Sequence, residues 1–179
     1  MMFQQLPTDN KKKTRSKAFK IAYISILTAL LFVLSILDSV LNFSFSIPGV
    51  KPGLSNIVII FSLYTKGFYF GLLLVIIKII INTLIFGGFS SFLFTFSGSI
   101  AGFFAMYLAK KILKEKISCI GISALGGFFH IVMQYTVSAF VMKSVAVFAI
   151  LPYAAMFSLI YSILVGIISE LIIKRWYLK

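Results

Sequence analysis

The sequence predicts an all-α integral membrane protein, built as a six-helix transmembrane bundle, and three observations lead to this class. The chain has 179 residues, of which 60% are hydrophobic, and its mean hydropathy is +1.07, both above what a soluble domain of this size needs. The apolar residues fall into six segments. Basic residues flank these segments, which is the pattern of membrane topology and argues against a nucleic-acid partner despite a formal net charge of +13.

The chain before the first apolar segment is polar and rich in lysine and arginine. We expect a disordered basic cytoplasmic tail over residues 1–17 and a single six-helix transmembrane domain over residues 18–179. No other hydrophilic stretch is long enough to fold separately. The first apolar run is too long for a cleaved signal peptide, and no small-residue cleavage site follows it.

The six apolar segments cover residues 18–37, 54–65, 68–86, 92–109, 117–142 and 152–173. Most of them reach the roughly 20 residues that a helix needs to cross the hydrocarbon core. The second segment is short, which leaves two alternatives. It forms a re-entrant helix, or it crosses the membrane together with residues 47–53, which would span part of the membrane in a non-helical conformation. Pro48 and Pro52 disfavour a helical conformation in the residues before them, so this part of the chain should be non-helical. A segment whose only role is to span lipid would not need a non-helical part. We expect this part of the chain to form one wall of a pocket at the outer face.

The distribution of lysine and arginine decides between these alternatives. With six crossings and the N-terminus inside, every basic residue lies on the cytoplasmic side except Lys51, Lys78 and Lys143. A re-entrant second segment would move the basic cluster at residues 110–116 to the outside, against the positive-inside rule. We therefore predict a multi-pass protein of the plasma membrane with six crossings and both termini cytoplasmic.

Small residues recur at helical spacing in the fourth and sixth segments. Burying apolar surface does not drive helices together in lipid, because the lipid tails are themselves apolar. Small side chains favour association there because they let helices approach closely. These rows predict internal packing of the bundle, and they consist of Gly98 and Gly102 in the fourth segment and Ser158, Ser162 and Gly166 in the sixth.

The first segment carries a similar row over several turns, formed by Ala22, Ser25 and Ala29. Two alternatives follow from it. The row either packs against another helix of the same bundle or docks a helix of a partner protein.

Polar side chains inside the apolar segments are the candidate binding residues, because such groups are costly in lipid. Lys78 and Asn82 lie four residues apart, as do His130 and Gln134, so each pair shares one helix face. Under the six-crossing topology these groups lie at mid-depth or toward the outer leaflet. We predict an outward-opening substrate-binding pocket formed by Lys51, Asn56, Lys78, Asn82, His130 and Gln134.

Each of these residues also has a purely structural interpretation. Lys78 could form an ion pair with Asp38 instead of meeting a ligand. His130 could donate to a backbone carbonyl within the core. Asn82 and Gln134 could join helices by hydrogen bonds.

Several enzyme classes are excluded by what the sequence lacks. There is no GxxxxGK[ST] motif for ATP, and the only aspartates are Asp9 and Asp38, so no aspartate-rich motif can hold magnesium diphosphate. The single cysteine, Cys119, excludes an internal disulfide and a cysteine metal cluster. We expect no catalytic residues, no metal site and no cofactor, and therefore a protein that is not an enzyme.

The charged groups of the predicted pocket favour an anionic or zwitterionic ligand. Lys51, Lys78 and His130 offer more positive than negative charge, and Asp38 is the only nearby acid. A ligand carboxylate or phosphate would offset the desolvation of a buried lysine. Phenylalanine and tyrosine rings would pack any planar part of the ligand, so a flavin-type ring is one candidate.

The stretch Pro-Gly-Val-Lys-Pro-Gly-Leu-Ser-Asn at residues 48–56, with Gly-Gly-Phe at 87–89 and Ser-Gly at 97–98, resembles the Gx transporter family. That family is also catalogued as heptaprenyl diphosphate synthase component I, and it is related to the S components of energy-coupling factor (ECF) transporters. The resemblance implies a six-helix S-component-like fold and a vitamin or precursor bound near the outer face. It also implies docking through the first helix onto a transmembrane coupling protein driven by two ABC-type ATPases. Ser25 and Ala29 match the docking row, with serine in place of alanine at the first position.

Two functions from different classes follow. The first is the substrate-binding subunit of an importer. The second is a non-catalytic membrane accessory protein of isoprenoid, menaquinone or flavin redox metabolism. The proteins that co-purify with the chain distinguish the two, because only the importer needs ATPase subunits.

Overall fold

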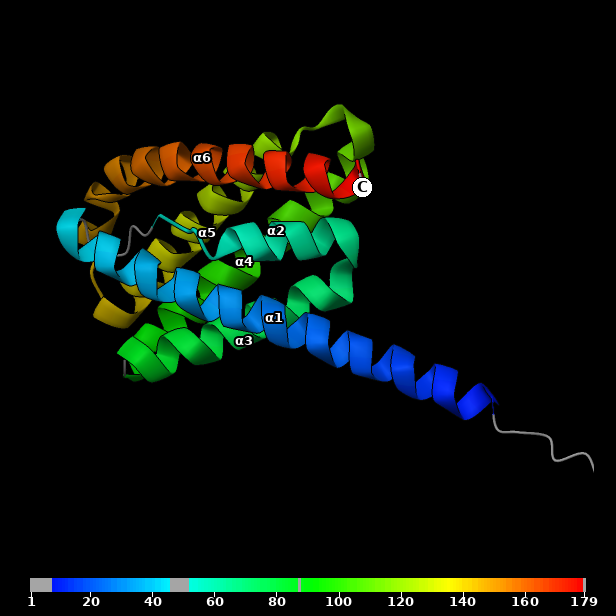
Figure 1. Ribbon diagram of the computed structural model, residues 1–179. Coiled ribbons are helices and arrows are strands. Elements are labelled where there is room, and N and C mark those ends of the chain that lie inside the picture. Colours follow the sequence, from blue (N-terminus) through cyan, green and yellow to red (C-terminus); the bar gives the residue numbers. More distant parts are fainter. Residues whose placement is uncertain (1–7, 46–51, 87, 179) are drawn as a thin grey trace, which may run out of the picture.

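The computed structural model describes residues 8–45, 52–86 and 88–178, and all regular structure in these ranges is helical. The described residues form six α-helices (Figure 1), which confirms the predicted all-α class. The α-helices are α1 (Thr8–Phe45), α2 (Asn56–Thr65), α3 (Phe68–Phe86), α4 (Phe89–Leu113), α5 (Cys119–Met142) and α6 (Leu151–Tyr177). Two short 3₁₀ helices lie between them, η1 (Lys114–Lys116) and η2 (Val145–Ala149).

Five of these helices are long and apolar enough to cross a membrane, which identifies a multi-pass membrane protein. In α1 the membrane-competent part is Lys20–Asp38. The short helix is α2, with only ten residues. Its residues from Ile57 to Leu63 are all buried, as expected for an apolar helix surrounded by other helices.

The first helix is longer than the sequence predicts. It begins at Thr8, so Thr8–Lys17 is helical where we expect a disordered tail. Lysine and arginine are good helix formers, and they extend a helix that the apolar segment has already nucleated. The predicted tail is corrected over this range, and residues 1–7 lie outside the described residues.

Contacts at its two ends fix the path of α2 along α1. The backbone N–H of Leu54, just before α2, donates to Asp38 Oδ1 at 2.7 Å. At the other end, the hydroxyls of Thr65 and Tyr23 share a hydrogen bond of 3.1 Å. The segment from Leu54 to Thr65 therefore runs antiparallel to α1 between the levels of Asp38 and Tyr23. That it is a sixth crossing stays a prediction, because α2 is shorter than the candidate membrane spans. Residues 52–55 are non-helical, and residues 47–51 of the predicted non-helical stretch lie outside the described residues.

The start of α1 and the end of α6 lie toward the same end of the bundle, which we call the basal end (Figure 1). The Tyr177 hydroxyl near the C-terminus donates to the carbonyl of Tyr64 at 3.2 Å. Lys110 Nζ, near the end of α4, donates to the carbonyl of Leu63 at 2.8 Å. Because successive helices alternate in direction, the basal end also collects the described basic residues at the ends of α2, α4 and α6, among them Lys66, Lys110 and Lys174. We call the opposite end the apical end.

Small residues hold α4, α5 and α6 close together, as predicted for the rows in the fourth and sixth segments. A Cβ atom added at Gly102 of α4 would lie 2.7 Å from the carbonyl oxygen of Gly126 on α5. One added at Gly166 of α6 would lie 2.6 Å from the Cα atom of Ile120. Contacts this short leave no space for a methyl group, so both glycines are required for the observed approach of the helices.

Candidate functional site

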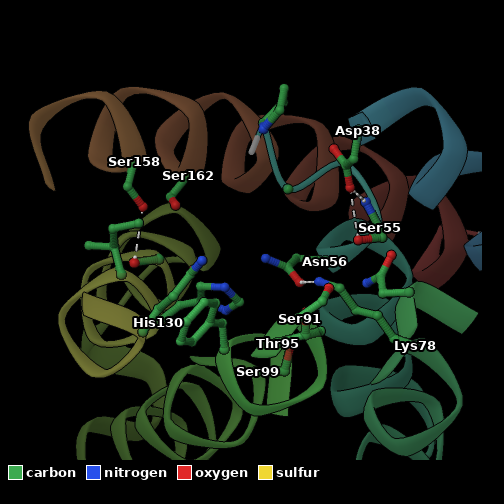
Figure 2. A pocket seen from close by; sticks show the side chains of 17 residues that line it. Asp38, Ser55, Asn56, Lys78, Ser91, Thr95, Ser99, His130, Ser158 and Ser162 are labelled. Atoms are coloured by element: carbon green, nitrogen blue, oxygen red, sulfur yellow. Dashed lines mark hydrogen bonds between the residues drawn. The ribbon is translucent and has the colours of Figure 1, made fainter. Parts of the chain in front are cut away.

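A cavity of about 280 Å³ lies in the apical half of the bundle. It is close to the lower end of the roughly 300–1,000 Å³ that small-molecule pockets occupy. All six α-helices contribute to its lining, and most of the lining side chains are polar (Figure 2). Polar groups gathered at this depth of an apolar bundle are functional candidates by default.

Five of the six predicted pocket residues meet at this cavity. Asn56, Lys78, Asn82, His130 and Gln134 all line it, although they come from three different helices. The sixth, Lys51, lies outside the described residues. Their proximity agrees with the predicted pocket, and their role in binding stays a prediction.

Lys78 and Asn56 form a hydrogen-bonded pair on one side of the cavity. Lys78 is only 6% exposed, and its Nζ atom donates to Asn56 Oδ1 at 2.6 Å. An ammonium group can only donate, so the amide oxygen of Asn56 faces the lysine and the amide nitrogen faces away. In Figure 2 this nitrogen points into the cavity, toward the side that holds His130. The pair therefore offers hydrogen-bond donors and positive charge to a ligand.

Asp38 has a structural role that the sequence did not reveal. Its carboxylate is 4% exposed, and both oxygens accept hydrogen bonds from the start of α2. Oδ1 accepts from Leu54 N, and Oδ2 accepts from the N–H and the hydroxyl of Ser55 at 3.1 and 2.9 Å. Helix starts leave N–H groups unsatisfied and carry partial positive charge, so a carboxylate from α1 is favourable there. By holding Leu54 and Ser55, Asp38 also fixes the position of Asn56, the residue after Ser55.

Hydroxyl groups on α4 and α6 complete the lining, and these were missed as site residues. On α4, Ser91, Thr95 and Ser99 line the cavity at four-residue intervals, and this spacing is the signal that could have identified them. On α6, Ser158 and Ser162 line it as well. We assigned both of these serines to packing, and Ser158 does donate to the carbonyl of Gly127 at 3.0 Å.

Gly98 of α4 makes room for the imidazole of His130. A Cβ atom at Gly98 would lie 2.9 Å from both Nε2 and Cδ2 of that ring and 3.0 Å from the carbonyl oxygen of His130. A row predicted as helix packing therefore also shapes the cavity.

The cavity offers little aromatic surface. Among the described lining residues, Phe94 is the only phenylalanine or tyrosine. The expected packing of a planar ligand between several aromatic rings does not match this lining, so we do not carry the flavin-type ring forward.

The small-residue row of α1 lies on the outside of the bundle. Ala22, Ser25 and Ala29 are all exposed, while Leu27 and Leu31, on the opposite face of the same helix, are buried. The internal-packing alternative is therefore wrong for this row. A partner helix or lipid can cover it.

Comparison with known proteins gives one match. The profile of the heptaprenyl diphosphate synthase component I family matches residues 27–172, from the middle of α1 into α6. This range includes the described residues that line the cavity. No curated protein and no solved structure matches the chain. Because the matched range covers most of the sequence, this multi-span membrane protein belongs to the heptaprenyl diphosphate synthase component I family.

Proposed function

We propose that the chain is the substrate-binding membrane subunit, or S component, of an energy-coupling factor type importer for a vitamin-like or precursor molecule. The observation that carries this proposal is the polar cavity, to which all six helices contribute and in which a lysine is buried. A bundle that needed only to span lipid would gain nothing from such a lining. The chain itself binds the molecule, and its partners supply the energy.

The lining supports an anionic or zwitterionic substrate. Lys78 and the amide nitrogen of Asn56 are donors, whereas the carboxylate of Asp38 already accepts three hydrogen bonds from the start of α2. An acidic group on the substrate would complement this donor surface, and the low dielectric around it would strengthen the attraction.

The orientation that suits an importer places the basal end in the cytoplasm and the cavity toward the outside. It follows the positive-inside rule, because Lys66, Lys110 and Lys174 belong to the basal end and Lys143 to the apical end. In a Cys119→Ala background, we expect Lys143→Cys to react with an impermeant maleimide on intact cells. Lys114→Cys should react only after the membrane is opened. Labelling of position 114 on intact cells would contradict this orientation.

The partners that the proposal requires are a transmembrane coupling protein and two ABC-type ATPases. The exposed row Ala22, Ser25 and Ala29 offers a surface where a helix could approach closely. We expect Ser25→Trp and Ala29→Trp each to abolish co-purification of the ATPase subunits while substrate binding persists, since the row faces away from the cavity.

The matched control for this experiment is Leu30→Trp. Leu30 is also on α1 and 47% exposed, but it lies about a quarter turn from the row. It should retain the partners. If the complex assembles with tryptophan at position 25 and at position 29, the interface lies elsewhere.

The family description favours a second function, a non-catalytic membrane accessory of isoprenoid or menaquinone metabolism that associates with a prenyl diphosphate synthase. The chain lacks the aspartate-rich motif that such catalysis requires, so prenyl transfer itself would belong to the partner. Affinity purification of the tagged chain from its own membranes separates the two functions. ATPase subunits support the importer, and a synthase without ATPases supports the accessory.

A further inference from the structure

The three hydroxyl residues on α4 form a continuous row on the cavity side of that helix. Ser91, Thr95 and Ser99 lie in succession along α4, next to the Lys78–Asn56 pair (Figure 2). The first two are partly exposed and the last is buried. The row therefore leads from the more accessible part of the cavity to a buried position.

Ser99 lacks the hydrogen bond that buried helical hydroxyls usually make. It is only 5% exposed, yet its Oγ atom has no hydrogen-bond partner among the described residues. Other helical hydroxyls in this chain donate to the carbonyl four residues earlier: Thr83, Thr136 and Ser169 each do so at 2.8 Å. That bond is the usual solution for serine and threonine in membrane helices. A buried hydroxyl without a partner costs stability, and a ligand group that bonded to it would recover that cost.

The position of Ser99 distinguishes it from similar groups elsewhere. Thr28 and Ser62 also carry buried hydroxyls without a partner among the described residues, but neither lines the cavity. At Ser99 the unsatisfied hydroxyl and the cavity coincide, and the donor pair of Lys78 and Asn56 lines the same space.

We propose that the α4 hydroxyl row is a second binding subsite, and that Ser99 determines which molecules bind. A serine hydroxyl both donates and accepts, so the complementary ligand group is a hydroxyl, a keto group or an amide. With the anionic group at Lys78 and Asn56, the substrate class becomes a compact hydroxy, keto or amido acid. A plain fatty acid or a polyprenyl chain would leave Ser99 unpaired. The inference rests on the proposed function in treating the cavity as a ligand site and in placing an anionic group at Lys78 and Asn56.

The test measures how strongly the cavity discriminates between paired acids. The probes are a panel of hydroxy, keto and amido carboxylic acids of vitamin size, each matched with the acid in which that group is replaced by hydrogen or methylene. Dissociation constants come from thermal shifts and calorimetry of the detergent-solubilised full chain. We expect at least one polar acid to bind the wild type about tenfold or more tightly than its matched analogue, because a site with a buried polar group rejects ligands that leave it unpaired.

The variants Ser99→Ala and Ser62→Ala form a matched pair, since each removes one buried hydroxyl that has no partner. Both should fold with an unchanged or higher melting temperature. Ser99→Ala should bind the two acids of the pair with nearly equal affinity, whereas Ser62→Ala should discriminate like the wild type. Thr95→Val provides a second variant in the row, and we expect it to reduce the discrimination as well.

Two results would overturn the inference: full discrimination in Ser99→Ala, or the absence of any polar acid in the panel that binds the wild type better than its analogue. Failure of the importer proposal would look different. Discrimination that depends on Ser99, in a chain that never co-purifies with ATPases, would keep the subsite and remove the importer. If ATPases co-purify with the chain but Ser99→Ala discriminates between the paired acids as the wild type does, the importer is supported and the subsite is removed.

Discussion

Replacing Lys78 with methionine is expected to weaken binding of an anionic substrate at least tenfold, a loss of about 1.4 kcal/mol or more. Methionine keeps much of the length and apolar character of the lysine stem and removes the charge. Lys78 is buried beside the cavity and donates to Asn56 at 2.6 Å, so the substitution removes a charged donor from a site of low dielectric. The measurement is the dissociation constant of the compound that co-purifies with the wild type, identified by mass spectrometry.

Lys143→Met is the matched control for this prediction, because Lys143 is exposed near the apical end. It removes the same charge from the same half of the molecule and should leave the affinity unchanged. A stable Lys78→Met protein with full affinity would remove the lysine from the site. If Lys78→Met unfolds the protein and a further Asp38→Asn change restores it, the lysine serves an ion pair with Asp38 rather than a ligand.

Replacing Asp38 with alanine is expected to cause a large loss of stability, about 3 kcal/mol or more. Three donors at the start of α2 would lose their acceptor: the partly buried N–H of Leu54 and the buried N–H and hydroxyl of Ser55. Each unsatisfied buried donor costs roughly 1–3 kcal/mol. Because Asn56 follows directly and holds Lys78, affinity for the substrate should fall together with stability. Denaturant unfolding in detergent, monitored by circular dichroism, measures the first effect.

Asp38→Asn provides a graded comparison. The amide keeps one acceptor oxygen but lacks the charge and the second acceptor, so its loss of stability should lie between those of the wild type and the alanine variant. An alanine variant as stable as the wild type would show that the start of α2 does not depend on Asp38.

The fold could be predicted because its main determinants are local. Each apolar run is bounded by basic or turn residues, and the four-residue spacing of Lys78 with Asn82 and of His130 with Gln134 places each pair on one face of a helix. The alternation of crossing helices then brings these faces to the same end of the bundle. The extension of α1 to Thr8 was missed because a basic stretch has no apolar pattern, although its residues are good helix formers.

The missed features of the cavity depend on contacts between helices. Asp38 is 16 residues away from Leu54 in sequence, and no local pattern links a carboxylate on one helix to the start of the next. The four-residue spacing of Ser91, Thr95 and Ser99 places them on one helix face but does not show that they line a cavity, because serine and threonine in membrane helices commonly bond to their own backbone. Ser99 is distinguished by being buried without such a bond and by lining the cavity, and both are properties of the folded chain.

The anchoring of α2 by Asp38 has a consequence for how cargo preference can evolve in such a bundle. The backbone donors that often recognise anions at a helix start are here occupied by a carboxylate of the same chain. The framework of the cavity is thus held by contacts within the chain, and under the proposed function recognition falls to side chains such as Asn56, Lys78 and Ser99 on α2, α3 and α4. If the chain binds a substrate as proposed, point substitutions at those positions would change which molecule it prefers while the scaffold stays intact.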